Sequence, residues 1–407
     1  TGDSELVQIE LGELGEDALS SSQLMVISPG IPVDAPFTDV VRNAGIPIWS
    51  EIELAYHYGK GKIAAITGTN GKTTTTALVG EIVKAHNAKT IVVGNIGIPY
   101  TELCDTTDDD SDTVAEISSF QLETVIDFHP NVSAILNLTP DHLNRHYTFE
   151  NYGNVKFSIT KNQTMDDVTV LNYDDEHTRA MGEKAKDHCH VVYFSRLEKP
   201  AGGVYVEDGD IILEDGDKKI NVLAIKDLKL MGAHNVENVL AAVGISYYMG
   251  VPVDVIRDVA TSFKAVAHRI EYVDTVDGVA YYNDSKGTNP DAAIKGIQAM
   301  VAPTFLIGGG YDKGSEYDEW IEAFDGKVKW LVLIGQTAQK IADCAKRHGF
   351  NSIIFEENLQ DAVAYCHENA VDGDAVLLSP ACASWGQFDN YEQRGDMFKE
   401  YVRSYKE

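Results

Sequence analysis

The sequence predicts an α/β fold with mainly parallel sheets. Apolar runs of strand length alternate with longer helix-like segments through most of the 407 residues, which is the pattern of α/β architecture. One of these runs, residues 63–67, leads through a Gly-rich turn into a segment with good helix propensity. The length favours two or three domains over one.

Three blocks can be separated along the chain, at residues 1–57, 58–264 and 265–407. The first is too small for a complete nucleotide-binding unit, and the third has the strand spacing of a second doubly wound domain. A helix is expected from Thr73 to about Ala85, and a hairpin over 204–213 around Asp208-Gly209. The other expected strands are 24–27, 46–48, 63–67, 90–93, 113–116, 133–138, 169–172, 191–194, 280–283, 304–307, 330–334 and 375–378.

Composition argues against several classes of function. The chain has 33 basic and 63 acidic residues, a formal net charge of −30, which disfavours nucleic acid or an anionic lipid surface as a partner. It contains no apolar run of membrane-spanning length and no signal-peptide pattern. The five cysteines include no C-x-x-C pair, so we expect a reducing compartment without a disulfide or zinc framework. A cytoplasmic protein is therefore predicted.

A phosphate-binding loop is predicted at Gly68-Thr69-Asn70-Gly71-Lys72-Thr73-Thr74, between the strand at 63–67 and the following helix. Glycines let backbone N–H groups turn toward a phosphate, and the helix N-terminus adds positive potential. Lys72 supplies a mobile cation, and the Thr73 hydroxyl can bind Mg²⁺. The general P-loop has a further glycine where this chain has Ile66, so the motif is a compact variant.

Polar clusters follow two other predicted strands. Glu116 ends the strand at 113–116, and the strand at 133–138 runs into the segment Thr139-Pro140-Asp141-His142-Leu143-Asn144-Arg145-His146. Open α/β sheets bind ligands outside the carboxyl ends of their strands, so both clusters are expected near Lys72. A carboxylate in that place suits Mg²⁺, although a lone Glu is more often structural. His146 is interpreted as a surface or loop histidine.

The compact loop resembles that of the Mur ligase and folylpolyglutamate synthetase superfamily, whose members join an amino acid to a carboxylate at the expense of ATP. The matching motifs extend over nearly the whole chain and include a long C-terminal signature. They are Gly94–Pro99, Glu116–Glu123, Leu136–His146, Tyr152–Phe157, Leu230–Ala242, Ala267–Ile270, Tyr282–Pro290, Gly308–Gly314 and Leu377–Gly395. Two of them, Tyr282–Pro290 and Leu377–Gly395, are similar to the family members that add D-glutamate.

The resemblance implies a three-domain Mur ligase architecture, with a central P-loop domain and a C-terminal Rossmann-like domain. The family's first strand, Gly-rich turn and helix are missing before Thr1, so the N-terminal, UDP-binding domain is interpreted as truncated. Because ATP contacts are split between the second and third blocks, closure about the linker at about 262–268 is expected to assemble the site.

The resemblance also implies the ligands and the residues that hold them. ATP would be bound by Gly68, Thr69, Asn70, Gly71, Lys72, Thr73, Thr74, Asn235, Arg269 and Asp284. Two Mg²⁺ ions would be held by Thr73, Glu116, His142 and a carbamylated Lys156, and the catalytic residues would be Lys72, His142 and Lys156. The substrates would contact Ser28, Pro29, Gly30, Asn95, Ser118, Ser119, Gln121, Lys286, Thr288, Lys313, Ser384, Trp385 and Tyr391. By residue type alone, Lys156 would be a solvated helix lysine.

The activity implied is ligation of D-glutamate to UDP-N-acetylmuramoyl-L-alanine through an acyl phosphate, a cytoplasmic step of peptidoglycan synthesis carried out by a monomer. Two other interpretations stay open. One is a ligase for another amino acid, as in folylpolyglutamate synthesis, and the other is an ATP-binding protein that is inactive because its first domain is short. A nucleotide switch is a different class. It is weakened because Thr160-Lys161-Asn162-Gln163 does not fit the guanine-reading N-K-x-D pattern.

Overall fold

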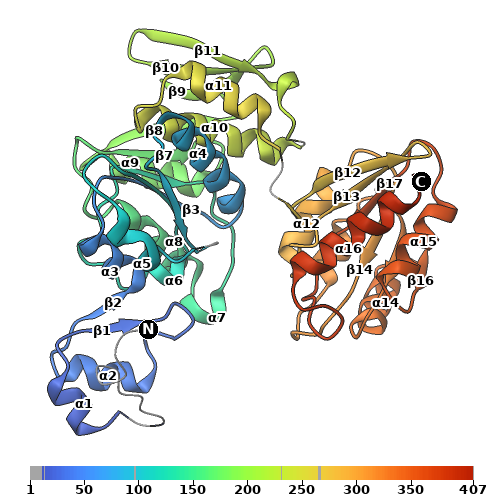
Figure 1. Ribbon diagram of the computed structural model, residues 1–407, viewed down its shortest axis with the longest axis horizontal. Coiled ribbons are helices and arrows are strands. Elements are labelled where there is room, and N and C mark those ends of the chain that lie inside the picture. Colours follow the sequence, from blue (N-terminus) through green and yellow to red (C-terminus); the bar gives the residue numbers. More distant parts are fainter. Residues whose placement is uncertain (1–11, 13, 96–97, 231, 265–266, 407) are drawn as a thin grey trace. The chain divides into compact units, whose positions relative to one another are not determined.

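A computed structural model describes residues 12, 14–95, 98–230, 232–264 and 267–406, which form two compact units (Figure 1). The first unit lies within Thr1–Leu228 and His234–Ser262, and the second within Lys229–Ala233 and Phe263–Glu407. Each unit contains one large, mostly parallel sheet with helices, so the predicted α/β fold is confirmed. The further division at residue 57 stays a prediction. Among the described helices, none is long and apolar enough to cross a bilayer.

The N-terminal part of the first unit contains a small parallel sheet in which Met25 pairs with Ile48. Pro36 begins α2, where its fixed φ suits the first helical turn. The Ser50 side chain accepts the Glu53 N–H and so caps α3. The elements are α1 (Glu16–Ser21), β1 (Met25–Ile27), α2 (Pro36–Asn43), β2 (Ile48–Ser50) and α3 (Glu51–Tyr58).

The large sheet of the first unit has nine strands in the order β11-β10-β9-β8-β7-β6-β3-β5-β4. Neighbours from β4 to β9 are parallel, while β10 pairs antiparallel with both β9 and β11. Asp208 and Gly209 both have positive φ at the predicted hairpin. The strands are β3 (Lys62–Thr67), β4 (Ile91–Gly94), β5 (Asp112–Glu116), β6 (Val132–Ile135), β7 (Val168–Asn172), β8 (His190–Ser195), β9 (Gly203–Glu207), β10 (Asp210–Asp215) and β11 (Lys218–Ala224).

Helices cover both faces of this sheet. On one face, α4 and α10 pack closely against the sheet. Gly80 of α4 brings no side chain against Val92, and Gly244 of α10 brings none against Val170. On the other, residues of α3, α5, α6 and η2 join the buried cluster that contains Ile63 and Ala65. The helices are α4 (Lys72–His86), α5 (Tyr100–Leu103), η1 (Cys104–Thr106), α6 (Ser119–Leu122), α7 (Leu143–His146), α8 (Phe149–Phe157), η2 (Ser158–Thr160), α9 (Glu176–Ala185), η3 (Ile225–Asp227), α10 (Ala233–Tyr248) and α11 (Val253–Ser262).

The position of β3 explains where this unit can bind a ligand. β3 lies between β5 and β6, and the chain order reverses there, so the carboxyl end of β3 is a topological switch point. The predicted strand at 133–138 was too long, since β6 ends at Ile135. Beyond it the chain leaves the sheet, and Asn137 forms hydrogen bonds with Asn70 in the loop that follows β3.

The second unit is doubly wound, as predicted, with strand order β12-β13-β17-β14-β15-β16 and only β12 antiparallel. One buried cluster includes Trp320 and Ile341 from α13 and α14, and another includes Val363 and Phe398 from α15 and α16. The elements are β12 (Glu271–Val276), β13 (Val279–Asn283), α12 (Pro290–Ala299), β14 (Thr304–Gly308), α13 (Asp318–Glu322), β15 (Val328–Leu333), α14 (Ala338–Arg347), β16 (Ile353–Phe355), α15 (Leu359–Asn369), β17 (Ala375–Leu378) and α16 (Tyr391–Ser404).

Candidate active site

The loop after β3 has the backbone shape of a phosphate cradle. Gly68 and Gly71 have φ values of 147° and 83°, which side chains disfavour, and Gly71 is the N-cap of α4. The Lys72 ammonium group donates to the carbonyls of Gly68 and Thr69 at 2.8 and 2.9 Å. Lys72 is therefore folded back over the loop, and the helix N-terminus adds its positive potential there.

Two residues to which the sequence analysis gave no role hold this loop in place. The Asn137 side chain accepts the Asn70 N–H at 2.8 Å and donates to the Asn70 carbonyl at 3.1 Å. The Tyr152 hydroxyl lies 3.1 Å from the Thr69 hydroxyl. A polar residue between apolar neighbours at the end of a predicted strand was the available signal for Asn137.

The start of α10 lies against the same loop. Asn238 accepts a hydrogen bond from the Thr75 hydroxyl at 3.3 Å and donates to Asn235 at 3.1 Å. A Cβ atom added at Gly71 would lie 2.2 Å from the Asn238 side-chain oxygen. The structure thus brings Asn235 and Asn238 to the phosphate loop. Met231, the second residue of the matching motif, lies outside the described residues.

Lys156 is buried, which corrects the interpretation of a solvated lysine. Its side chain is 1% exposed, donates to the Gly68 carbonyl at 2.9 Å, and lies 4.8 Å from the Tyr152 ring centre. Burial, followed by the nearby charge of Lys72, holds the Lys156 pKa well below its usual range. The opposing charges of Asp141 and Glu116 offset only part of this effect. An amine in this setting loses its proton readily and becomes a nucleophile.

Glu116 is also buried rather than a surface residue, and it pairs in register with Ile66 on β3. One carboxylate oxygen accepts from the Asn95 side chain at 2.8 Å. The other is buried and has no hydrogen-bond partner among the described residues. A buried carboxylate oxygen without a donor is costly unless a cation compensates it, so this site fits a divalent ion. Ile96 and Gly97 of the predicted motif lie outside the described residues.

The two histidines at the end of the cluster after β6 have opposite environments. His142 is exposed, has a φ of 52°, and lies 3.4 Å from Asp141. His146 is 1% exposed, between the Ser119 hydroxyl at 2.9 Å and Glu123 at 3.5 Å. The prediction of a surface histidine was therefore wrong for His146. Burial lowers its pKa to about 4, so its ring is neutral near pH 7.

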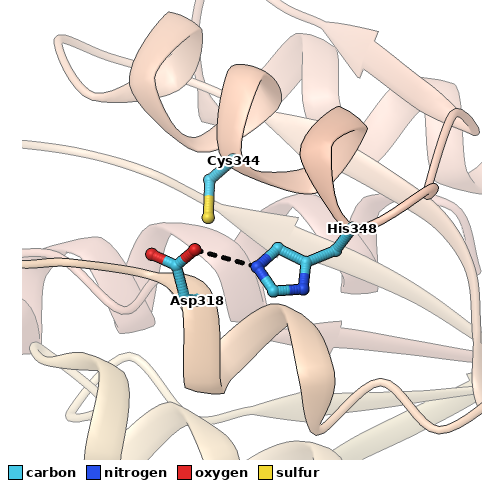
Figure 2. A group of neighbouring side chains, drawn as sticks. All are labelled: Asp318, Cys344 and His348. Carbon is cyan, nitrogen blue, oxygen red and sulfur yellow. Dashed lines mark hydrogen bonds and ion pairs between the residues drawn. The ribbon is translucent and has the colours of Figure 1, made fainter.

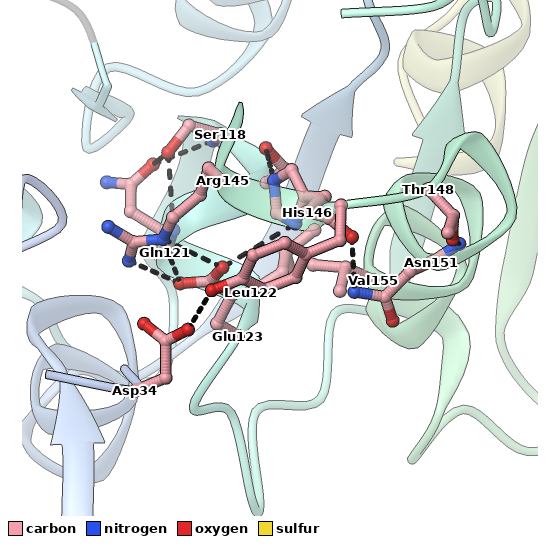
Figure 3. Close-up of polar contacts among 12 residues, drawn as sticks. Asp34, Ser118, Gln121, Leu122, Glu123, Arg145, His146, Thr148, Asn151 and Val155 are labelled. Atoms are coloured by element: carbon pink, nitrogen blue, oxygen red, sulfur yellow. Dashed lines mark hydrogen bonds and ion pairs between the residues drawn. The ribbon is translucent and has the colours of Figure 1, made fainter. Parts of the chain in front are cut away.

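The predicted substrate residues of the first unit form two groups. Ser118 caps α6 by accepting the Gln121 N–H, and Gln121 returns a bond to the Ser118 N–H at 2.7 Å, a capping box. Ser28, Pro29 and Gly30 form the turn after β1. Arg145 donates to the carbonyl of the next residue of that turn, Ile31. It also donates to the Glu123 carboxylate (Figure 3).

In the second unit, Arg269 lies between two residues with positive φ, His268 at 64° and Ile270 at 48°. Such backbone is uncommon outside glycine and persists where neighbouring contacts enforce it. Buried Asp284 makes such a contact: its carboxylate accepts hydrogen bonds from the Ile270 N–H at 3.3 Å and from the Ser379 hydroxyl at 2.7 Å. Burial raises the Asp284 pKa to about 6, while the Arg269 charge acts in the opposite direction.

A buried arginine, to which the sequence analysis gave no role, connects the two D-glutamate-type motifs. Arg394 donates to the Ser285 hydroxyl at 2.9 Å, the Ser285 carbonyl at 2.8 Å and the Cys382 carbonyl at 3.2 Å. Next to it, the Lys286 ammonium lies 5.6 Å from the Tyr391 ring centre. Thr288 donates its N–H to the Lys286 carbonyl at 2.8 Å. Lys286, Thr288 and Tyr391 therefore lie close together.

The remaining predicted residues of this unit lie on two adjoining segments. Tyr311 and Ala383 form a short antiparallel bridge, which places the segment before Lys313 beside that of Ser384. Ser384 is buried and Lys313 is exposed. The Trp385 ring, 56% exposed, lies edge-on to Tyr311 at 5.6 Å. Cys382 contacts the Tyr317 and Thr337 hydroxyls at 3.1 and 3.2 Å, which fits a small packed residue.

Comparisons with known proteins agree with these two units. Residues 66–246 match the Mur ligase middle domain, and residues 268–382 match the Mur ligase, glutamate ligase domain. UDP-N-acetylmuramoylalanine–D-glutamate ligase of Lachnospira eligens is 57% identical, over 98% of this chain and 88% of the relative. The protein of the same name from Lachnoclostridium phytofermentans is 53% identical, over 98% and 87%.

Solved structures with the same fold are more distant in sequence. The UDP-N-acetylmuramate-alanine ligase MurC of Thermotoga maritima has a TM-score of 0.63 at 20% identity, with 94% of this chain and 85% of that chain covered. The MurF ligase of Thermotoga maritima in complex with ADP has a TM-score of 0.61 at 17% identity, with 95% and 97% covered. At such identities the likeness concerns the fold.

Proposed function

This chain belongs to the Mur ligase family, and from that premise we propose that it joins D-glutamate to UDP-N-acetylmuramoyl-L-alanine in the cytoplasm, using ATP. The relatives that are 57% and 53% identical over 98% of the chain carry that activity in their names. The reaction is an ATP-dependent amide ligation in peptidoglycan synthesis. A folylpolyglutamate-type ligase and an inactive ATP-binding protein are not favoured by these relatives.

One observation in the structure supports this assignment most directly. The phosphate loop carries Lys72 on its surface and the buried Lys156 beneath it, both donating to the Gly68 carbonyl. A nucleotide switch has no evident use for a buried lysine of lowered pKa at this position. A ligase uses it, because a carboxylate and a phosphoryl group must both be held and neutralised there.

The ATP phosphates are bound by the backbone N–H groups of the loop and by Lys72, which leaves the two carbonyls it now contacts. Asn235, Arg269 and Asp284 contribute to nucleotide binding from α10 and from the second unit. Phosphoryl transfer to the L-alanyl carboxylate depends chiefly on alignment and charge neutralisation. Lys72 supplies positive charge where negative charge accumulates.

The donor residues around the phosphate loop of the first unit suit Mg²⁺. The unpartnered carboxylate oxygen of Glu116 and the Thr73 hydroxyl, at the start of α4, are hard oxygen donors. His142 and a modified Lys156 complete the set for two ions. Bound Mg²⁺ neutralises phosphate charge and polarises the oxygens of the reacting groups.

The environment of Lys156 supports its modification. The neutral Lys156 amine attacks CO₂, an N–C bond forms while one C–O π bond opens, and a proton is released, which leaves a carbamate whose single negative charge is shared by two oxygens. Burial favours loss of the ammonium charge. The product places an anion beside Lys72, and thereby provides oxygen ligands for Mg²⁺.

D-Glutamate binds to the second unit. It carries two carboxylates and one ammonium, so its recess requires cations and hydroxyl donors, which Lys286, Thr288, Lys313 and Ser384 provide. Tyr391 and Trp385 line it with aromatic surface. The muramoyl nucleotide contacts the turn at Ser28, Pro29 and Gly30, together with Asn95, Ser118, Ser119 and Gln121. The chain acts as a monomer.

The test is phosphate release from ATP in the presence of UDP-N-acetylmuramoyl-L-alanine and a panel of D- and L-amino acids. We expect release to require D-glutamate, with L-glutamate and D-aspartate near background. Release that is independent of the amino acid would support a nucleotide hydrolase instead. A preference for L-glutamate with a folate acceptor would support the folylpolyglutamate-type reaction.

A further inference from the structure

Three side chains of different chemistry converge where α13 begins and α14 ends (Figure 2). Asp318 is the first residue of α13, Cys344 lies in the last turn of α14, and His348 is its C-cap. One ligand atom of each, a carboxylate oxygen, Sγ and a ring nitrogen, lies within 4.8 Å of the others. We propose that Asp318, Cys344 and His348 bind a transition metal ion of the Zn²⁺ type.

The donor set selects this class of ion. Thiolate and imidazole bind Zn²⁺ and Co²⁺, whereas Mg²⁺ and Ca²⁺ prefer oxygen ligands. Cys344 and His348 are four residues apart at the end of α14, so both side chains project from the same helix face. His348 Nε2 already lies 2.8 Å from an Asp318 oxygen. An ion would replace the proton that these two atoms now share.

The surroundings of His348 support metal binding. Its other ring nitrogen, Nδ1, faces a Glu322 carboxylate oxygen at 3.7 Å. A carboxylate there keeps the proton on Nδ1 and directs the Nε2 lone pair toward the ion. Cys344 and His348 also lie at the C-terminal, negative end of α14, which favours a cation. The His348 side chain is 26% exposed, so solvent can supply a fourth ligand.

Two features of the cluster disfavour ion binding and therefore limit the affinity. Arg347 lies 3.4 Å from the same Asp318 oxygen and must release that contact. Burial raises the Cys344 pKa to about 11, so binding must displace the thiol proton. Affinity is therefore expected to rise with pH, because each ion bound releases a proton.

A second cluster, Glu53, His57 and Asp127, has its ligand atoms equally close together. There the Glu53 carboxylate already accepts the backbone N–H groups of Ile126, Asp127 and Phe128 at 2.9, 2.7 and 3.1 Å. Those bonds satisfy the carboxylate and compete with an ion. At the α13–α14 cluster, by contrast, both Asp318 oxygens are free of backbone N–H contacts among the hydrogen bonds of the described residues.

The experiment is titration of the reduced, metal-free full chain with Co²⁺ in the presence of excess Mg²⁺, which occupies oxygen-rich sites. Thiolate coordination gives a near-ultraviolet charge-transfer band. We expect one equivalent of Co²⁺ to develop this band, and Zn²⁺ to displace it. Cys344→Ser should abolish the band. Cys366→Ser is the matched control, since Cys366 is equally buried in the same unit, and it should keep the band.

Two further variants keep the test decisive if Cys344→Ser fails to fold. His348→Gln alters an exposed position and should weaken Co²⁺ binding and the band together. Glu322→Gln should weaken Co²⁺ binding about 10-fold. A band of equal strength in Cys344→Ser, or no band in the folded wild-type chain at millimolar Co²⁺, would overturn the proposal and leave an ordinary His–Asp ion pair at a helix end.

Discussion

Replacing Gly71 by Ala is the substitution whose effect the structure predicts in most detail. Gly71 has a φ of 83°, and an added Cβ would lie 2.2 Å from the Asn238 side-chain oxygen. Asn238 would have to move, and its hydrogen bond with Thr75 would break. The change thus acts at the start of α4 and at the loop proposed to hold the ATP phosphates.

The expected loss of stability has two parts. Left-handed backbone costs an L-residue about 1–2 kcal/mol. Displacing Asn238 removes one hydrogen bond, worth about 0.5–1.5 kcal/mol. We therefore expect the free energy of unfolding of the first unit to fall by about 1.5–3.5 kcal/mol, and ATP binding to weaken as well.

Gly209→Ala is the matched control. Gly209 has a φ of 85°, but no atom of the described part of the chain would lie within 4 Å of an added Cβ. This variant should lose only the backbone part, about 1–2 kcal/mol, and should keep its affinity for ATP. Urea unfolding and calorimetric titration with a non-hydrolysable ATP analogue measure both quantities.

A second substitution checks the mechanism of the loss. In Gly71→Ala combined with Asn238→Ala, the collision is absent, so the two changes should cost less together than the sum of each alone. The reasoning is refuted if Gly71→Ala and Gly209→Ala are equally stable and bind the analogue equally well. Strict additivity in the double variant would also contradict it.

Four further predictions concern charged groups. Lys72→Ala should lower kcat/KM for ligation at least about 100-fold with the melting temperature unchanged; full turnover would exclude the assigned role. In ¹³C-bicarbonate, the folded chain should give a carbamate carbon signal by NMR that Lys156→Arg lacks. Because the His146 pKa is lowered to about 4 from 6.5, the contribution of His146 to the unfolding free energy should be constant above pH 6.5 and should fall by up to about 1.4 kcal/mol per pH unit as the pH drops from 6.5 to 4. His146→Gln should remove that slope in pH-dependent urea unfolding. Arg394→Lys, which cannot reproduce three forked hydrogen bonds, should lower stability by about 2–4 kcal/mol and raise the KM for D-glutamate.

Local patterns in the sequence were sufficient for most of the fold. The central strands are apolar runs bounded by turn residues, and the loop at 68–74 contains its own backbone signals, two glycines before a helix. Three edge or near-edge strands were missed, β11, β12 and β16. β11 begins Lys218-Lys219, so its start does not show a clear apolar pattern. β16 is apolar but has only three residues, which is a short signal.

The partners within the site could not be predicted in the same way. Asn137 and Asn70 are 67 residues apart, and Asn238 and Thr75 are 163 apart. No local period encodes such pairings. His146 stands in a polar segment between Arg145 and Tyr147, which resembles a surface loop, yet contacts with Ser119 and Tyr152 bury it. Residue type and local pattern alone likewise understated the burial of Glu116 and Lys156, which results from packing between strands and α8.

The most direct test follows one oxygen atom through the reaction. UDP-N-acetylmuramoyl-L-alanine labelled with ¹⁸O in the alanyl carboxylate is incubated with ATP, Mg²⁺ and D-glutamate, and the released phosphate is analysed by mass. If the carboxylate attacks the γ-phosphorus and the amine then expels phosphate, each phosphate released contains one ¹⁸O from the substrate. Unlabelled phosphate from labelled substrate would mean that ATP is hydrolysed by water, and would contradict an acyl phosphate at this phosphate loop.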